Sequence, residues 1–335
     1  MGQPKSRIAI VGGGLSGLSC AQRLQAAGHA VEVFDKGRGP GGRICTRHDA
    51  EAGDFDHGAQ FVTTREPEFE AWVSELVLQG HAVQATWRLR RPGRVAGAPA
   101  RFVGTPGMSA LPAALAVGLT VHRRARVTAL DRQTGGWWLQ LDDQARVGPF
   151  EAVVVAIPAP QAVELLTPVA PALAARAGDA EMAPCWALMA AWDEGLGLAS
   201  DAWEPDHGVL AWAAREGAKA GRKPGERWVL HATAAWSVAH LEDQPDGVEA
   251  ALLDALAEVA GQPLPAPSHV RTHRWRHARV TRPLGVDGLM APDLGLAACG
   301  DWCLGSRVED AWLSGWRTAQ LVHEALLPAP ARRVG

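Results

Sequence analysis

The sequence predicts an α/β protein of two domains, one built on a parallel sheet and one on a mixed or antiparallel sheet. The chain has 335 residues, about twice the length of a typical domain. Near its start, two short apolar runs at 8–11 and 30–34 flank a segment of helical periodicity. Between residues 160 and 280, apolar runs of strand length follow one another instead.

A glycine-rich turn follows the first apolar run. Gly12, Gly14 and Gly17 have the spacing G-x-G-x-x-G. In a strand–turn–helix unit, the first glycine permits a tight turn, the second lets a pyrophosphate approach the backbone, and the third lets the helix lie close to the strand. The helical segment stops near Gly28, and the second run ends at Asp35, where a carboxylate would hold a ribose hydroxyl. This order predicts a Rossmann-like dinucleotide-binding domain.

Two further segments near the start are expected to approach a ligand. Residues 36–43 are rich in glycine and proline and predict a loop, in which Arg38 and Arg43 could pair with phosphates. Residues 53–61 alternate like a short strand, and Gly58 in their middle marks a close backbone approach.

The remaining elements follow from periodicity and turn signals. In chain order they are a helix over 66–79, a hairpin over 82–104 with turn signals at Pro92, Gly93 and Gly97, a short helix over 104–117, two or three strands over 119–142, a strand over 150–158, strands over 185–192, 209–214, 228–236 and 269–275, a helix over 247–260, a strand over 294–302 and an amphipathic helix over 308–326. Glu309 and Asp310 open the last helix, where its dipole favours negative charge.

Composition excludes several classes of protein. The net charge is −3 and the basic residues form no cluster, so we expect no nucleic-acid partner. Five cysteines without a CxxC pair predict reduced thiols in a cytoplasmic protein. We expect neither a membrane span nor a signal peptide, because no apolar run is long enough. His273 and His277 alternate along a strand too far apart to chelate easily, so no metal site is expected.

Across its whole length the chain resembles the FAD-dependent amine-oxidase superfamily. The likeness is carried by residues 12–17 with Asp35, 37–43, 153–158 and 299–311. We predict a discontinuous FAD-binding domain of residues 1–65, 105–160 and 285–335, and a substrate domain of residues 66–104 and 161–284, with the flavin at their boundary.

The resemblance implies non-covalent FAD. It implies that Asp35 holds the adenosine ribose, that Val127 contacts adenine, that Asp301 meets the ribityl chain, and that the helix beginning near Asp310 faces the flavin pyrimidine edge. Cys303 is expected to be a packed thiol rather than a covalent attachment. The full predicted set is Gly12, Gly14, Leu15, Ser16, Gly17, Asp35, Lys36, Arg38, Gly42, Arg43, Gly58, Ala59, Gln60, Phe61, Val127, Gly300, Asp301, Glu309, Asp310 and Ala311.

Within the superfamily, the closest likeness is to the renalase-like proteins. It is carried by residues 55–61, 228–242 and 275–281. Renalase-like enzymes are flavin oxidases of dihydronicotinamide dinucleotides reduced at the wrong ring carbon. They pass a hydride to the flavin and then to O2, and they yield NAD(P)+ and H2O2. Relatives often carry an asparagine in the stretch that matches residues 215–222, where this chain has Gly217, which puts a catalytic asparagine role in doubt.

The chemistry of this substrate suggests four candidate catalytic residues. A dihydronicotinamide becomes aromatic on losing a hydride alone, so its site needs a ring platform and orienting donors rather than a base. Trp275, His231, Gln60 and Arg215 fit that need. Trp275 and His231 are also consistent with ordinary core positions.

Amine oxidases of the superfamily use an aromatic cage and a lysine near the flavin. This chain has no tyrosine, and only Lys219 and Lys223 could serve as that lysine. An FAD-dependent amine oxidase or desaturase is therefore the alternative enzyme, and a flavin-binding redox sensor without turnover is the second alternative. NAD as the resident dinucleotide is the least favoured reading, because it gives the Gly300–Asp301 junction no role.

Overall fold

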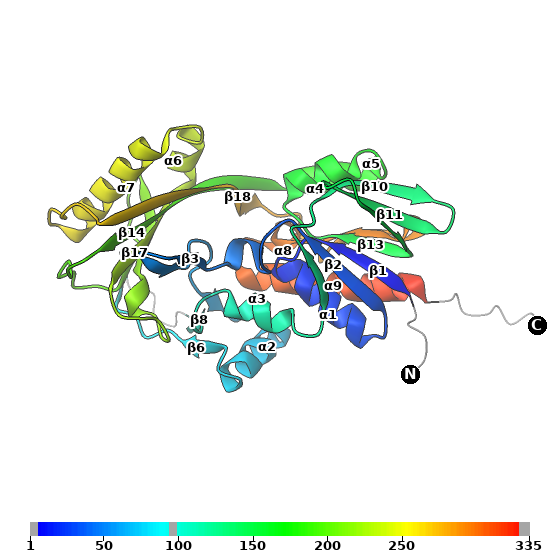
Figure 1. The fold of residues 1–335 in the computed structure, drawn as a ribbon, viewed down its shortest axis with the longest axis horizontal. Helices are drawn as coiled ribbons and strands as arrows, with labels where there is room; N and C mark the ends of the chain where they lie inside the picture. The colour runs from blue at the N-terminus through cyan, green and yellow to red at the C-terminus, as the bar shows by residue number, and fades with distance from the viewer. Residues whose placement is uncertain (1–5, 94–98, 328–335) are drawn as a thin grey trace, which may run out of the picture. The chain divides into compact units, whose positions relative to one another are not determined.

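The computed structural model describes residues 6–93 and 99–327, and its contacts divide the chain into two compact units (Figure 1). Unit 1 lies within Met1–Gly42, Leu115–Glu181 and Arg282–Gly335, and unit 2 comprises Arg43–Ala114 and Met182–Thr281. The predicted turn at Gly97 lies outside the described residues.

Unit 1 is built on a sheet of order β19-β20-β13-β1-β2-β9. Its strands are β1 (Arg7–Val11), β2 (Ala30–Asp35), β9 (Thr120–Arg123), β13 (Ala152–Val155), β19 (Leu289–Ala291) and β20 (Leu296–Ala298). All neighbouring pairs are parallel except β19–β20. Ile8 and Ile10 are fully buried, because a parallel sheet is covered on both faces.

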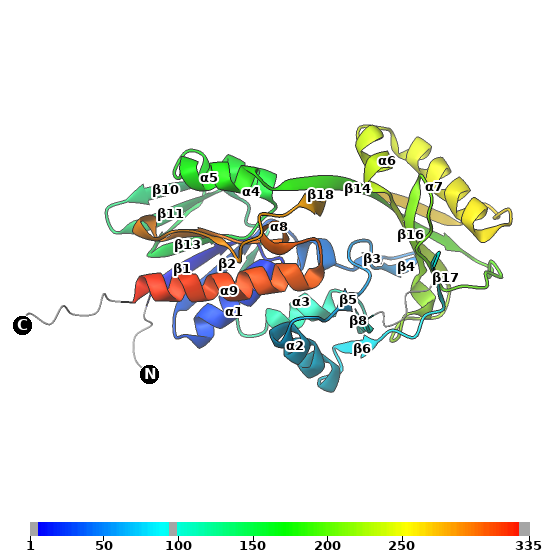
Figure 2. The ribbon, with the colours of Figure 1, turned by 180° about the vertical axis from the view of Figure 1, so that it is seen from behind.

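Two long helices of unit 1 pack closely together. These are α1 (Leu15–Ala26) and α9 (Val308–Leu326), which lie side by side in Figure 2. A Cβ placed on Gly315 of α9 would lie 1.9 Å from the carbonyl oxygen of Ser16, so only glycine allows this approach. The Ser19 hydroxyl also donates to the carbonyl of Trp312 at 2.8 Å. The sequence predicts the β1–α1–β2 unit and the helix over 308–326 at nearly these bounds.

Unit 1 also contains a smaller antiparallel sheet and three short helices. The sheet is β10 (Val127–Gln133), β11 (Gly136–Leu141) and β12 (Arg146–Phe150). The helices are α4 (Ala159–Leu166), α5 (Pro171–Gly178) and α8 (Asp301–Leu304). The predicted strand over 294–302 is too long, because the chain enters α8 at Asp301.

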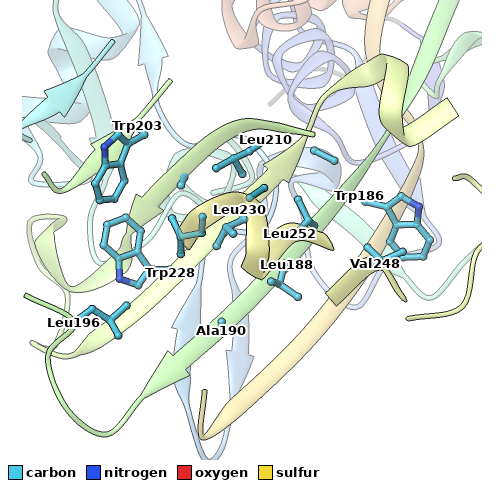
Figure 3. Packing of buried hydrophobic residues seen from close by; sticks show 14 of the residues in the cluster. Trp186, Leu188, Ala190, Leu196, Trp203, Leu210, Trp228, Leu230, Val248 and Leu252 are labelled. Carbon is cyan, nitrogen blue, oxygen red and sulfur yellow. The ribbon is translucent and has the colours of Figure 1, made fainter. Parts of the chain in front are cut away.

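Unit 2 contains a mixed sheet of order β18-β14-β17-β16-β15-β7. Its strands are β7 (Leu89–Arg90), β14 (Glu181–Trp192), β15 (Ala202–Trp203), β16 (Leu210–Arg215), β17 (Glu226–Ala232) and β18 (His269–Arg282). Helix α7 (Pro245–Ala260) contributes Val248 and Leu252 to a core shared with Leu188 and Leu230 (Figure 3). The predicted strands over 185–192 and 209–214 and the helix over 247–260 are confirmed.

Smaller elements complete unit 2. They are β3 (Arg47–Asp49), β4 (Gly53–Phe55), β5 (Val62–Thr63), α2 (Pro67–Leu78), β6 (Ala82–Gln84), β8 (Arg101–Gly104), α3 (Ala110–Leu115) and α6 (Ala234–Ala239). No helix in the described ranges is long and apolar enough to cross a membrane.

Two predicted strands of unit 2 are shorter than the sequence indicates. The strand over 228–236 ends at Ala232, because the Thr233 hydroxyl accepts the Trp236 backbone N–H at 3.2 Å and caps α6. The strand over 53–61 ends at Phe55. There Asp56 is held by the Thr46 hydroxyl at 2.7 Å and the Met108 backbone N–H at 3.0 Å.

The unit boundaries also differ from the predicted domains. Residues 43–65 and 105–114 belong to unit 2, and residues 161–181 belong to unit 1. The backbone N–H groups of Met108 and Ser109 donate to Asp56 and Thr46 and so tie the first two segments together, and α5 packs against β19 of unit 1. These contacts join residues that are far apart in the sequence, so local sequence patterns do not predict them.

Candidate active site

The glycine turn after β1 has a closed side and an open side. Gly12 has φ +110°, and a Cβ there would lie 2.5 Å from the Ala156 carbonyl oxygen. A Cβ on Gly17 would lie 1.9 Å from the Gly12 carbonyl oxygen, whereas one on Gly14 would meet nothing within 4 Å. The turn is therefore packed at Gly12 and Gly17 and open at Gly14, beside the N-terminus of α1, which is the geometry of a pyrophosphate site.

Asp35 at the end of β2 is fixed beside this turn. Its carboxylate accepts the Gly13 and Gly37 backbone N–H groups, both at 2.6 Å. The loop after β2 folds along the turn, because the Gly41 N–H donates to the Gly13 carbonyl at 2.8 Å. Lys36 and Arg38 are exposed on this loop. Gly42 also lies against the turn, since its Cβ would be 3.7 Å from the Gly14 Cα.

Other predicted cofactor residues of unit 1 lie on elements joined to β1 and β2. Val127 begins β10, two residues after Ala125, whose N–H donates to the Asp35 carbonyl at 2.9 Å. Leu15 and Ser16 are buried in the first turn of α1, and the Ser16 hydroxyl donates to Cys299 Sγ at 3.1 Å.

The junction between β20 and α9 is organised by hydrogen bonds and charge. The Gly300 N–H donates to the Ser314 hydroxyl at 3.0 Å, and Asp301 is buried at the start of α8. Arg307 donates to both oxygens of Asp310, at 3.1 and 2.8 Å, and lies 3.6 Å from Glu309. Both acidic side chains at the start of α9 are thus paired with one arginine, while Ala311 follows them, partly exposed.

These features fit FAD. The open face at Gly14 leaves room for a pyrophosphate, and Asp35 is held in place at the end of the adjoining strand. Cys303 is fully buried, and burial raises the pKa of its thiol far above the ordinary range, so it is an unreactive side chain.

In unit 2, the side chains of Trp275 and His231 bind the same backbone oxygen. The Trp275 indole N–H and the His231 Nε2–H both donate to the carbonyl oxygen of His57, at 3.0 and 3.1 Å. The His57 ring stacks on Trp275 with centroids 5.1 Å apart, and His273 lies edge-on to both rings at 5.0 and 4.2 Å. We call these four residues the histidine cluster.

The three imidazoles of the cluster are neutral at pH 7. Burial is the first cause in each case. It lowers the pKa of His57 to about 3, with help from His273, and the pKa values of His231 and His273 to about 4. The cluster therefore consists of neutral aromatic rings and carries no positive charge.

Gln60 and Arg215 do not join this cluster. Gln60 donates to the carbonyls of Asp56 and Gly58, and its amide oxygen accepts from Lys219 at 3.1 Å and Trp212 at 3.4 Å. Arg215 is paired with Asp201 and lies 3.6 Å from Glu226. The amide of Gln60 and the guanidinium of Arg215 are thus engaged within unit 2, which the residue types alone do not reveal.

The other predicted residues of unit 2 pack around the same loop. One guanidinium nitrogen of Arg43 donates to the Ala278 carbonyl at 3.0 Å. The Arg43 carbonyl accepts the Ala59 N–H at 2.9 Å, and a Cβ on Gly58 would lie 2.0 Å from that oxygen. Phe61 packs against Trp212, with centroids 5.3 Å apart.

A buried ion network joins four side chains that the sequence patterns do not bring together. Asp56, Glu216, Lys219 and Arg222 all have side chains no more than 2% exposed. Lys219 Nζ lies 3.0 Å from Asp56 and 2.5 Å from Glu216, and Arg222 pairs with Asp56 and lies 3.5 Å from Glu216. The only signal in the sequence is one acid and two bases, spaced three apart, in a glycine-rich loop.

The network sets the protonation of its carboxyl groups. Burial alone would raise the pKa of Asp56, but Lys219 and Arg222 lower it to about 2. Burial raises the pKa of Glu216, although Lys219 opposes this. Among the described residues, no group of three or more His, Cys, Asp or Glu side chains could hold a metal ion.

Comparisons with known proteins agree with the nucleotide-binding geometry. Residues 10–76 match the NAD(P)-binding Rossmann-like domain, and residues 75–323 match the flavin containing amine oxidoreductase family. The zeta-carotene-forming phytoene desaturase of Myxococcus xanthus is 45% identical over 56 residues, which is 17% of this chain and only 11% of that protein.

A solved structure shares the fold over nearly the whole chain. It is described as "Putative protoporphyrinogen oxidase" from Exiguobacterium sp. 255-15, with a TM-score of 0.73 and 13% sequence identity, and the match covers 96% of this chain and 100% of that one. Because the family match spans most of the chain, this protein belongs to the flavin containing amine oxidoreductases and is an FAD-dependent oxidoreductase.

Proposed function

We propose that the protein oxidises misreduced dihydronicotinamide dinucleotides, with O2 as the acceptor. The substrate loses a hydride, and together with O2 and one proton this yields NAD(P)+ and H2O2. The observation that carries the proposal is the histidine cluster, which combines the Trp275 ring with three neutral imidazoles. A set of neutral aromatic groups suits a planar ring that needs orientation and no proton abstraction.

FAD in this proposal is bound non-covalently by unit 1. The open backbone at Gly14 and the N-terminus of α1 receive its pyrophosphate, and Asp35 receives the adenosine ribose. Bound FAD supplies hydride acceptance and delivery to O2. The burial and raised thiol pKa of Cys303 support attachment without a covalent bond.

The charges of unit 2 favour this substrate over an amine. Oxidation of an amine requires its neutral form, and a nearby base or a free lysine assists. Lys219 Nζ is instead engaged by Asp56, Glu216 and Gln60, and Lys223 is exposed on the surface. An amine oxidase or desaturase remains the alternative, supported by the family and by the desaturase relative.

Anaerobic reduction of the bound flavin tests the proposal. The substrates are dihydronicotinamide dinucleotides reduced at a ring carbon other than C4, ordinary NADH and NADPH, and a panel of primary amines. We expect the misreduced isomers to bleach the flavin rapidly and the other compounds to reduce it at least about 100-fold more slowly. When air is admitted, reoxidation of the flavin should produce one H2O2 per substrate oxidised. Bleaching by amines, with the isomers inert, would overturn the proposal in favour of the alternative.

A matched pair of variants tests the role of the cluster. Trp275→Leu removes the ring that stacks on His57, whereas His240→Gln changes the C-cap residue of α6, a histidine that packs on Trp236. We expect Trp275→Leu to slow flavin reduction by about 10-fold or more, the loss expected from a few kcal/mol of stacking and positioning. His240→Gln should react like the unchanged protein.

A further inference from the structure

The hydrogen bonds around the His57 carbonyl determine the tautomer of His231. A carbonyl oxygen has no hydrogen to give, so the nitrogen that binds it must be a donor. His231 Nε2 lies 3.1 Å from this oxygen, and the Trp275 indole nitrogen lies 3.0 Å from it. The two donors occupy both lone pairs of the oxygen, and the ring hydrogen of His231 is therefore on Nε2.

The other nitrogen of His231 carries a lone pair. Burial, with a contribution from Lys219, lowers the pKa of this histidine to about 4, although the bond to His57 opposes the shift. At neutral pH the ring holds a single hydrogen, and Nδ1 is an acceptor. Within residues 6–93 and 99–327, Nδ1 makes no hydrogen bond, and the side chain is partly exposed.

Because Nδ1 of His231 is an acceptor without a donor among the described residues, a bound ligand can supply the donor. This nitrogen belongs to a ring that is held at the same carbonyl oxygen as the indole of Trp275, so the acceptor and the indole are parts of one cluster. A nicotinamide ring carries a primary amide at its edge, which has two N–H groups. A ketone in the same place has no N–H group and therefore could not donate this hydrogen bond.

We propose that His231 Nδ1 accepts a hydrogen bond from the carboxamide of the substrate ring and so selects substrates that carry an amide N–H. This inference rests on the proposed function and adds a specificity-determining role for one named atom. The role is acceptance rather than the donation that the residue type alone suggests.

The tautomer can be tested without turnover. Nitrogen NMR of the ¹⁵N-histidine-labelled holoenzyme at pH 7 distinguishes a protonated from an unprotonated ring nitrogen, and the His231→Gln spectrum assigns the signals. We expect His231 to show hydrogen on Nε2 and a lone pair on Nδ1. Hydrogen on Nδ1, or on both nitrogens, would overturn the inference.

Substrate discrimination tests the interaction itself. The probes are two misreduced dinucleotides that differ only in a carboxamide or an acetyl group on the ring. The unchanged protein should prefer the carboxamide by about 10-fold or more in kcat/KM, the cost of leaving an acceptor without its donor. His231→Leu should reduce the preference to within about 3-fold, and His231→Gln, which keeps one donor and one acceptor, should restore it. His240→Gln should leave it unchanged.

The outcomes separate the inference from the function on which it rests. If neither dinucleotide reduces the flavin, the proposed function fails and the inference fails with it. If both reduce the flavin at equal rates in the unchanged protein, or if His231→Leu keeps the full preference, only the inference fails. Should His231→Leu not fold, the preference of the unchanged protein and of His231→Gln still decides the matter.

Discussion

Lys219 is the residue whose loss should cost the fold most. Its ammonium is buried between Asp56 and Glu216, so Lys219→Met leaves two buried carboxyl groups short of a cation. We expect the free energy of unfolding to fall by about 3–5 kcal/mol. The exposed Lys223, four residues further on, provides the control, because Lys223→Met should change it by less than about 0.5 kcal/mol. Urea denaturation of the three proteins measures both values.

The network also predicts strong coupling between Lys219 and Glu216. Adding Glu216→Gln to Lys219→Met removes the carboxyl group that has lost its partner, and the remaining Asp56–Arg222 pair is balanced. We therefore expect the double variant to be more stable than the sum of the single losses by about 1–3 kcal/mol. Additive losses would show that the four side chains do not act as one network.

Two glycines of the first turn should respond differently to the same added methyl group. Gly14→Ala meets open space, so the apoprotein should keep its Tm while its affinity for FAD falls about 10-fold or more. Gly17→Ala meets a backbone oxygen at 1.9 Å and should destabilise the apoprotein itself. Gly195→Ala, also in open space but in unit 2, is the control. Unchanged FAD affinity in Gly14→Ala would contradict the assignment of the open face.

Residue type suggests candidates, but it does not show which of them are already bound to other side chains. The roles of Gly12 and Gly17 in the turn follow from G-x-G-x-x-G spacing alone, because steric limits on the backbone are local. Gln60 and Arg215 were reasonable polar candidates, yet bonds to Lys219 and Asp201 engage them. These partners lie in other parts of the sequence, so local sequence patterns do not reveal them.

At the level of elements, the sequence predicts the long periodic helices and the short helix α3, but it does not predict several other short helices. The helices over 67–78, 245–260 and 308–326 have a clear apolar face and lie within two residues of the predicted bounds. Helix α6 was predicted as strand, because its six residues are too few to show a period and its start depends on the Thr233 cap. Helices α4 and α5, eight residues each, were missed for the same reason.

The packing of α1 against α9 depends on Gly315. We expect Gly315→Ala to force the helices apart at Ser16, to lower the Tm of the apoprotein by several degrees and to weaken FAD binding, because Ser16 lies in the first turn of α1. Glu324→Ala, at an exposed position of the same helix, should change neither quantity. Calorimetry and FAD titration check both. Equal behaviour of the two variants would show that the helix contact tolerates a methyl group.

At the scale of the whole molecule, the two contact units of the structure have other borders than the domains that the sequence predicts. Each unit has its own core, one around the parallel sheet and one around β14, β16, β17 and α7. Some segments belong to a different unit from the predicted domain, and side-chain contacts hold them there. One example is Asp56, which accepts a hydrogen bond from the Met108 N–H in unit 2. Composition and length set the number of domains, whereas contacts over long sequence separations set which segments each one contains.

The histidine cluster predicts that unit 2 is the acid-sensitive unit. In the unfolded chain these imidazoles bind protons near pH 6.5, but in the folded protein burial holds the pKa of His57 near 3 and those of His231 and His273 near 4. Between about pH 6.5 and 4 the unfolded chain therefore binds more protons, and stability falls as the pH is lowered. Each ring adds a slope of up to about 1.4 kcal/mol per pH unit.

Other titrating groups do not cancel this trend. Asp56 and Asp201, with pKa values near 2, stay charged in the folded protein throughout that range, so they add acid sensitivity only towards its lower end. Glu216 and Glu249, whose pKa values are raised by burial, act in the opposite direction, but they offer two protons against three.

Hydrogen exchange, corrected for intrinsic rates, can locate the effect. On lowering the pH from 7 to 5, amides of β14 and β17 should lose protection well before those of β1 and β13, because the three imidazoles belong to unit 2. His273→Phe removes one of the three titrating rings and keeps an aromatic edge, so it should reduce the pH slope of unit 2 by about one third. Loss of protection at the same pH in both units, with a slope unaffected by His273→Phe, would mean that the acid response arises elsewhere.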